Sequence, residues 1–136
     1  MAKIERFEDI ISLQEARKLN KILGDLIDGG RFKHSYRIVN QIEGSAGSVM
    51  DNIAEGFERG GNKEFVQFLY IAKGSCGELR SQLYRALDRN YINQKEFDSF
   101  SVHAMKISSL IQKFITYLEN SEAKGIKYKS RPGKTS

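Results

Sequence analysis

Two short clusters of small residues lie at mirror positions in this chain, and they restrict its fold more than any other feature. Gly44-Ser45-Ala46-Gly47 and Gly74-Ser75-Cys76-Gly77 flank the pair Gly60-Gly61 at equal distances. Two helices that fold back on each other bring together residues equally far from their turn. Glycine inside a helix costs about 0.5–1 kcal/mol relative to alanine, so these glycines need a structural reason. We interpret four of them as points of close approach between two helix backbones: Gly44, Gly47, Gly74 and Gly77.

The spacing of apolar residues predicts helices over about 12–28, 35–59, 62–90 and 93–121. Ser12 with Glu15, and Asn93 with Glu96, have the spacing of a capping box at a helix start. The last helix carries a heptad seam, in which apolar residues alternate in steps of three and four. Four such helices with short connections predict an all-α, antiparallel up-down-up-down four-helix bundle.

The net charge of +5 is unevenly distributed along the 136 residues. Residues 122–136 hold five Lys or Arg residues and one Glu, whereas residues 1–121 are nearly neutral. We therefore predict one bundle domain, 1–121, followed by a basic, disordered tail, 122–136. The tail is either a solvated terminus or an arm that attracts phosphates.

The residues that enzymes use are scarce or badly spaced. The chain has two histidines and one cysteine, which excludes an internal disulfide and a multi-cysteine zinc site. No Glu-x-x-His pair of the kind that binds iron in bundles is present. We predict no catalytic residues, no metal and no cofactor. Because there is neither a signal peptide nor a membrane-length apolar run, we expect a cytoplasmic protein without membrane contact.

The segment from Asn52 to Arg59, Asn-Ile-Ala-Glu-Gly-Phe-Glu-Arg, and the segment from Lys63 through Glu78-Leu79 resemble a known family. It is the four-helix-bundle family of proteins encoded within 23S rRNA intervening sequences. The resemblance implies a non-enzymatic bundle that forms ring-like homo-oligomers, typically pentamers. It also places the chain near the accessory proteins of diversity-generating retroelements, which bind nucleic acid and a reverse transcriptase. Many members carry two arginines early in the second helix, where this chain has Glu43-Gly44.

Polar residues of that segment surround the predicted hairpin turn, and two interpretations of them stay open. They form either a shared recognition surface or a set of caps and ion pairs within the hairpin, in which Glu55 would meet Lys63. The residues in question are Asn52, Glu55, Arg59, Glu64 and Glu78.

Basic residues at helical spacing are the candidates for contact with nucleic acid, because phosphates require cations gathered on one surface. They are Arg17, Lys21, Lys73, Arg80, Arg85 and Arg89 in the bundle, with Lys127, Lys129 and Arg131 in the tail.

We accordingly predict a self-assembling bundle, a pentamer by resemblance, that binds RNA or DNA, in particular structured RNA. The alternative is a protein-interaction scaffold without nucleic-acid binding. Apolar residues beyond one seam per helix, such as Tyr70, Ile71 and Tyr84, support self-association in either case.

Overall fold

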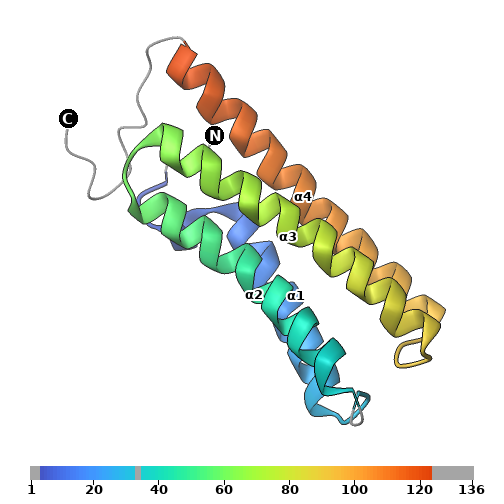
Figure 1. The fold of residues 1–136 in the computed structure, drawn as a ribbon. Coiled ribbons are helices and arrows are strands. Elements are labelled where there is room, and N and C mark those ends of the chain that lie inside the picture. Colours follow the sequence, from blue (N-terminus) through green and yellow to red (C-terminus); the bar gives the residue numbers. More distant parts are fainter. Residues whose placement is uncertain (1–3, 33–34, 124–136) are drawn as a thin grey trace.

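The computed structural model describes residues 4–32 and 35–123. A short 3-10 helix, η1 (Phe7–Asp9), precedes four α-helices: α1 (Ile11–Asp28), α2 (Tyr36–Glu58), α3 (Asn62–Asp88) and α4 (Gln94–Ala123). The helices lie side by side with alternating directions (Figure 1). Within the described chain each helix contacts its two neighbours and not the diagonal one. The predicted all-α up-down bundle is confirmed, and the predicted tail beyond Ala123 lies outside the described residues.

One continuous apolar core runs along the bundle axis. The predicted seam of α4 is fully inside it, and aromatic rings there meet edge to face, as Phe65 of α3 and Phe114 of α4 do at 5.3 Å between ring centres. Burial of these side chains is the main source of stability. The buried seam residues are Phe97, Phe100, Ala104, Ile107, Ile111, Phe114 and Leu118.

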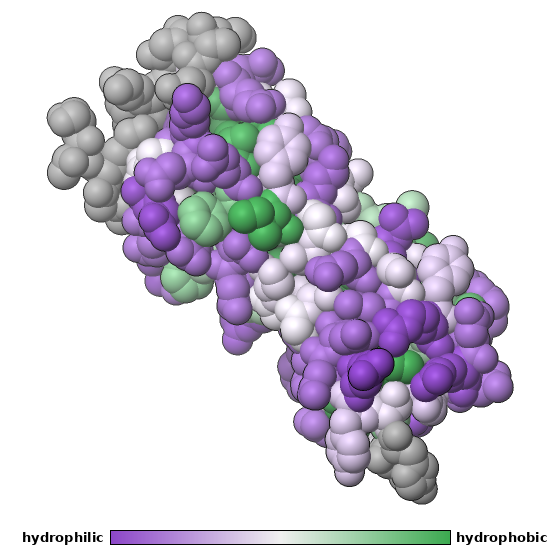
Figure 2. Space-filling view, viewed as in Figure 1, coloured by the Kyte–Doolittle hydropathy of each residue, from purple (hydrophilic) through white to green (hydrophobic). Residues whose placement is uncertain are grey.

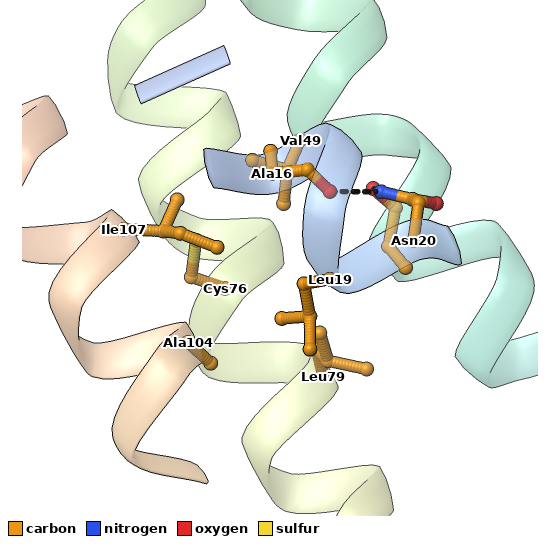
Figure 3. A pocket seen from close by; sticks show the side chains of 9 residues that line it. Ala16, Leu19, Asn20, Val49, Cys76, Leu79, Ala104 and Ile107 are labelled. Carbon is orange, nitrogen blue, oxygen red and sulfur yellow. Dashed lines mark hydrogen bonds between the residues drawn. The ribbon is translucent and has the colours of Figure 1, made fainter. Parts of the chain in front are cut away.

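A layer of small residues crosses the middle of this core. Each helix contributes one of them: Ala16, Ala46, Cys76 and Ala104. They line an apolar gap of about 10 Å³, shown in Figure 3. Beside it, the Asn20 amide donates hydrogen bonds to the carbonyl oxygens of Ala16 (2.9 Å) and Ala46 (2.8 Å), which ties α1 to α2. The third residue of each glycine-flanked cluster, Ala46 or Cys76, thus points inward.

The glycines of the two clusters do not have the predicted role. A Cβ atom built on Gly44, Gly47, Gly74 or Gly77 has no neighbour within 4 Å in this chain. Because they lie on the outward faces of α2 and α3, close approach of these two helices does not require them. The prediction of close packing at these four positions was wrong.

The close approach of α2 and α3 occurs at Gly56 instead. A Cβ atom there would lie 2.7 Å from Cβ of Phe68 and 2.8 Å from Cδ1 of Phe65, closer than real contacts allow. Further along the hairpin, the Ser48 and Ser75 hydroxyls form a hydrogen bond of 2.9 Å. At its far end Arg85 donates to the Gln41 side chain at 2.7 Å. The two helices therefore stay in contact along their length, as the mirror symmetry predicted.

The observed turns and helix caps agree with the sequence predictions at some positions and differ at others. Gly60 has φ of +85°, a conformation that favours glycine, and it separates α2 from α3. The predicted capping box of α4 is confirmed: the Glu96 amide donates to Asn93 Oδ1 at 2.8 Å, and the Asn93 amide donates to Glu96 Oε1 at 2.9 Å. The box predicted at Ser12 is wrong, because α1 begins one residue earlier and Ser12 is buried inside it.

Candidate nucleic-acid interface

The predicted basic residues separate into three groups, of which the first lies on α1. Arg17 and Lys21 are exposed there. The Lys21 ammonium forms an ion pair with Asp25 of the same helix at 3.0 Å. The charge of Lys21 is therefore neutralised locally by Asp25, so this group offers less positive charge than its sequence suggests.

The second group, Lys73 and Arg80, lies in the seam between α3 and α4. Lys73 Nζ donates to Gln112 Oε1 at 2.7 Å across that seam. The Nε atom of Arg80 is buried and has no hydrogen-bond partner among the described residues. Both side chains are partly buried. Lys73 thus links α3 to α4, and neither of these partly buried cations projects freely into solvent.

The third group is brought together with a residue that the sequence did not single out. Arg85 and Arg89 at the end of α3 line a hollow of about 230 Å³ with Arg37 from the first turn of α2. All three arginines are exposed. We call Arg37, Arg85 and Arg89 the arginine cluster. Arg37, which was absent from the predicted basic residues, could have been found by counting back from the Gly60-Gly61 turn, since residue 37 then lies opposite the end of α3.

The electrostatics of this hollow favour an anion. Asp88 is the single carboxylate among its lining residues, against three guanidinium groups. The hollow also includes Ser35, which precedes α2 and makes no capping hydrogen bond with its side chain. The first amides of a helix have no partner within it and carry the positive end of the helix dipole. In Figure 2 the most hydrophilic surface gathers where α2 begins and α3 ends, at the lower right.

The polar residues around the hairpin turn are largely engaged with each other. Arg59 forms ion pairs with Glu55 at 2.9 Å and Glu64 at 3.7 Å, and its guanidinium lies 5.3 Å from the centre of the Phe68 ring. Glu55 thus meets Arg59 in place of the expected Lys63. The hydrogen bond with Glu55 and the charge of that carboxylate raise the pKa of Arg59 above its usual value.

The other two predicted polar residues, Asn52 and Glu78, lie in different surroundings. Asn52 donates to the Ser48 carbonyl oxygen at 2.8 Å and lies 2.9 Å from the Ser48 hydroxyl, which extends the Ser48–Ser75 contact. Glu78 is exposed on α3. Of the five predicted polar residues, all except Glu78 therefore make contacts within the hairpin.

The family of 23S rRNA-intervening sequence proteins matches residues 8–113, most of the chain. The chain belongs to that family. A crystal structure of a protein of unknown function from the S23 ribosomal protein family of Bacteroides thetaiotaomicron has the same fold. Its TM-score is 0.71 at 19% identity, and the match covers 77% of this chain and 98% of that one. Comparison with curated proteins finds no match.

Cys76 and His103 are side chains capable of chemistry in this intervening-sequence protein, and they lie on different helices. Burial raises the pKa of the Cys76 thiol to about 11, which keeps this thiol protonated at neutral pH. His103 meets Glu15 at 3.1 Å between α4 and α1. No group of three His, Cys, Asp or Glu residues in the described ranges could hold a metal ion. Residues 4–32 and 35–123 also contain no helix with the length and apolar character needed to span a membrane.

Proposed function

We propose that this family member binds nucleic acid, structured RNA in particular, through the arginine cluster, and that it acts as a cytoplasmic homo-oligomer without catalytic activity or cofactor. The observation that carries the proposal is the convergence of Arg37, Arg85 and Arg89 on one hollow from two helices. Neither Arg37 nor Arg89 has a side-chain partner among the described residues. Two guanidinium groups are thus available to phosphate oxygens.

Arginine suits this task because its planar guanidinium donates two parallel hydrogen bonds to phosphate oxygens. Such contacts to the backbone hold a protein on nucleic acid without reading its sequence. The adjacent helix start adds amide donors of the same electrostatic sign. Recognition through this hollow is therefore directed at the phosphate backbone and not at particular bases.

A single cluster of this size binds phosphates weakly in physiological salt, and assembly into an oligomer would raise the overall affinity. The proposed oligomer is a pentamer, in which five clusters would act together on one nucleic acid. Linked sites raise the overall affinity because later contacts form at high effective concentration. Light scattering at several protein concentrations tests this part, and a monomer throughout would contradict it.

The binding part is tested by measuring affinity for a structured RNA as a function of salt. Replacing Arg37 and Arg89 by Gln should weaken binding and lower the slope of log K against log [salt] by about 1 for each phosphate that the variant no longer neutralises. The matched control is Arg17→Gln, an exposed arginine on α1, which should leave the slope unchanged. If both proteins show the parent's slope and affinity, the arginine cluster is not the binding site.

A protein-interaction scaffold is the second candidate, and a specific observation favours it. Tyr70 and Ile71 are 47% and 53% exposed and lie in the first half of α3, whereas the arginine cluster lies at its end. Exposed apolar side chains of this size on one helix face are typical of protein contacts. Absence of RNA and DNA binding at low salt, with an intact oligomer, would favour the scaffold over the nucleic-acid binder.

A further inference from the structure

Tyr36 opens α2 beside Arg37, and it is the most exposed large apolar side chain of the described residues, at 78%. It makes no hydrogen bond and no contact with another aromatic ring within the described chain. Tyr84, in contrast, packs against Phe97 at 4.5 Å between ring centres. Aromatic side chains also lose rotamer freedom in a helix, so this ring does not favour the start of α2. Neither burial nor helix propensity accounts for it.

The hollow of the arginine cluster is too small for a whole nucleotide. Its volume is about 230 Å³, whereas pockets that enclose a small organic molecule measure about 300–1,000 Å³. A phosphate fits inside it, and the base attached to that phosphate must lie outside. Ser35, Arg37 and Ile38 line the hollow, so the backbone of Tyr36 lies at its edge. Consecutive helix residues point about 100° apart, which places the exposed Tyr36 ring next to the hollow and not within it.

Contacts between two loops fix the geometry of this end of the bundle. The rings of Phe32 and Tyr91 lie 5.3 Å apart between centres. The Ser35 amide donates to the Phe32 carbonyl oxygen at 2.8 Å, and the Tyr91 amide donates to the Ala86 carbonyl oxygen at 2.9 Å. The start of α2 is thereby tied to the turn that follows Arg89. The backbone positions that carry the tyrosine and the arginines are therefore set before any ligand arrives, which lowers the entropy cost of binding.

We propose that the arginine cluster and Tyr36 together bind an unpaired nucleotide, with its phosphate among the guanidinium groups and its base stacked on the Tyr36 ring. This inference rests on the proposed nucleic-acid binding and names the form of nucleic acid that the site takes. In a double helix the faces of each base are covered by neighbouring bases, whereas loops, bulges and strand ends leave unstacked bases free to stack on aromatic side chains. Every base has such a face, so the site takes a single-stranded segment of any sequence.

The test compares the affinity of the full chain for a single-stranded RNA with its affinity for the same strand in a duplex. Tyr36→Ala should weaken binding of the single strand by about 5- to 150-fold and leave duplex binding unchanged. Tyr36→Phe, the matched control, keeps the ring and should keep the affinity of the parent. The salt dependence should stay the same in both variants, because the tyrosine carries no charge. Arg37→Gln, in contrast, should weaken both ligands and lower the salt slope for both.

A second measurement observes the stacking directly. The chain contains no tryptophan, so Tyr36→Trp introduces a single fluorescent indole at the site. Binding of the single strand should quench its emission, because the base lies on the indole, and binding of the duplex should not. Tyr70→Trp is the matched control. Tyr70 is also an exposed tyrosine, at 47%, and it lies in the first half of α3, so its replacement should keep its emission with either ligand.

Three results would overturn the inference. Equal weakening of single strand and duplex by Tyr36→Ala would show that the variant acts through assembly or folding. Unchanged binding of both ligands by Tyr36→Ala, with Arg37→Gln still weakening both, would leave the proposed phosphate site intact and remove the base from it. Emission of Tyr36→Trp that a bound single strand leaves unchanged would do the same. If the parent binds neither ligand at low salt, the proposed function itself fails, and the inference fails with it.

Discussion

Replacing Gly56 by alanine should destabilise the bundle, although alanine is the better helix former. The added Cβ atom would lie 2.7 Å from Cβ of Phe68, and that atom is attached directly to the α3 backbone. A side-chain rotation cannot relieve this contact, so α2 and α3 must move apart. Overpacking of this kind costs typically 1–3 kcal/mol, and a contact anchored to backbone belongs in the upper part of that range. The higher helix propensity of alanine offsets this loss of stability by about 1 kcal/mol. We expect a net loss of about 1–2 kcal/mol.

Gly44→Ala is the matched control, since it makes the same chemical change on the same helix. Its Cβ atom meets nothing within 4 Å in this chain, so only the gain in helix propensity of about 0.5–1 kcal/mol remains. The two variants should differ by about 2 kcal/mol in the free energy of unfolding, or roughly 6–10 °C in Tm.

Denaturation in urea, followed by circular dichroism at one fixed protein concentration, measures both variants under equal assembly conditions. The reasoning fails if Gly56→Ala stabilises the protein as Gly44→Ala does. Loss of stability in Gly44→Ala without a change in the monomer's helical content would instead place that glycine in a contact between copies.

Two further predictions concern groups whose pKa is shifted. The hydrogen bond from Lys18, and then the one with His103 and the charge of Lys106, hold the pKa of Glu15 below its usual value of 4.5. The contribution of Glu15 to the free energy of unfolding is therefore complete above pH 4.5 and is lost as the pH falls through the folded pKa. In Glu15→Gln the free energy of unfolding should fall less steeply in acid. Burial raises the pKa of Cys76 to about 11, so a thiol reagent at pH 8 should leave the native protein unmodified and react quickly in denaturant; rapid native labelling would show that the core opens readily.

Local signals predicted the helices well because their causes are local. The capping box at Asn93 and Glu96 involves only four consecutive residues, and it forms as expected although Arg31 also pairs with Glu96 at 2.7 Å. At Ser12 the same spacing fails, because α1 already begins at Ile11 and Ser12 is buried inside it. Glu15 pairs with Lys18 on the same helix and with His103 and Lys106 of α4, and the two contacts with α4 lie outside any local pattern.

The helical hairpin was predictable from symmetry, but its contact atoms were not. Mirror positions show which turns of α2 and α3 face each other, not which side of each turn does so. Gly56 and the outward-facing Gly44 look alike in sequence; Phe65 and Phe68 distinguish them only in space. Arg37 was not predicted for a related reason, since its neighbours in the hollow belong to the end of α3 and are distant from it in sequence.

The layer of Ala16, Ala46, Cys76 and Ala104 links the evolution of four helices that are distant in sequence. Protein interiors are packed at crystal-like density, and the gap of about 10 Å³ in this layer leaves room for little more than one water-sized group. A larger residue at any of these positions must therefore be offset by a smaller one on another helix. Across homologous chains the total side-chain volume of this layer should vary less than the volume at any one of its positions.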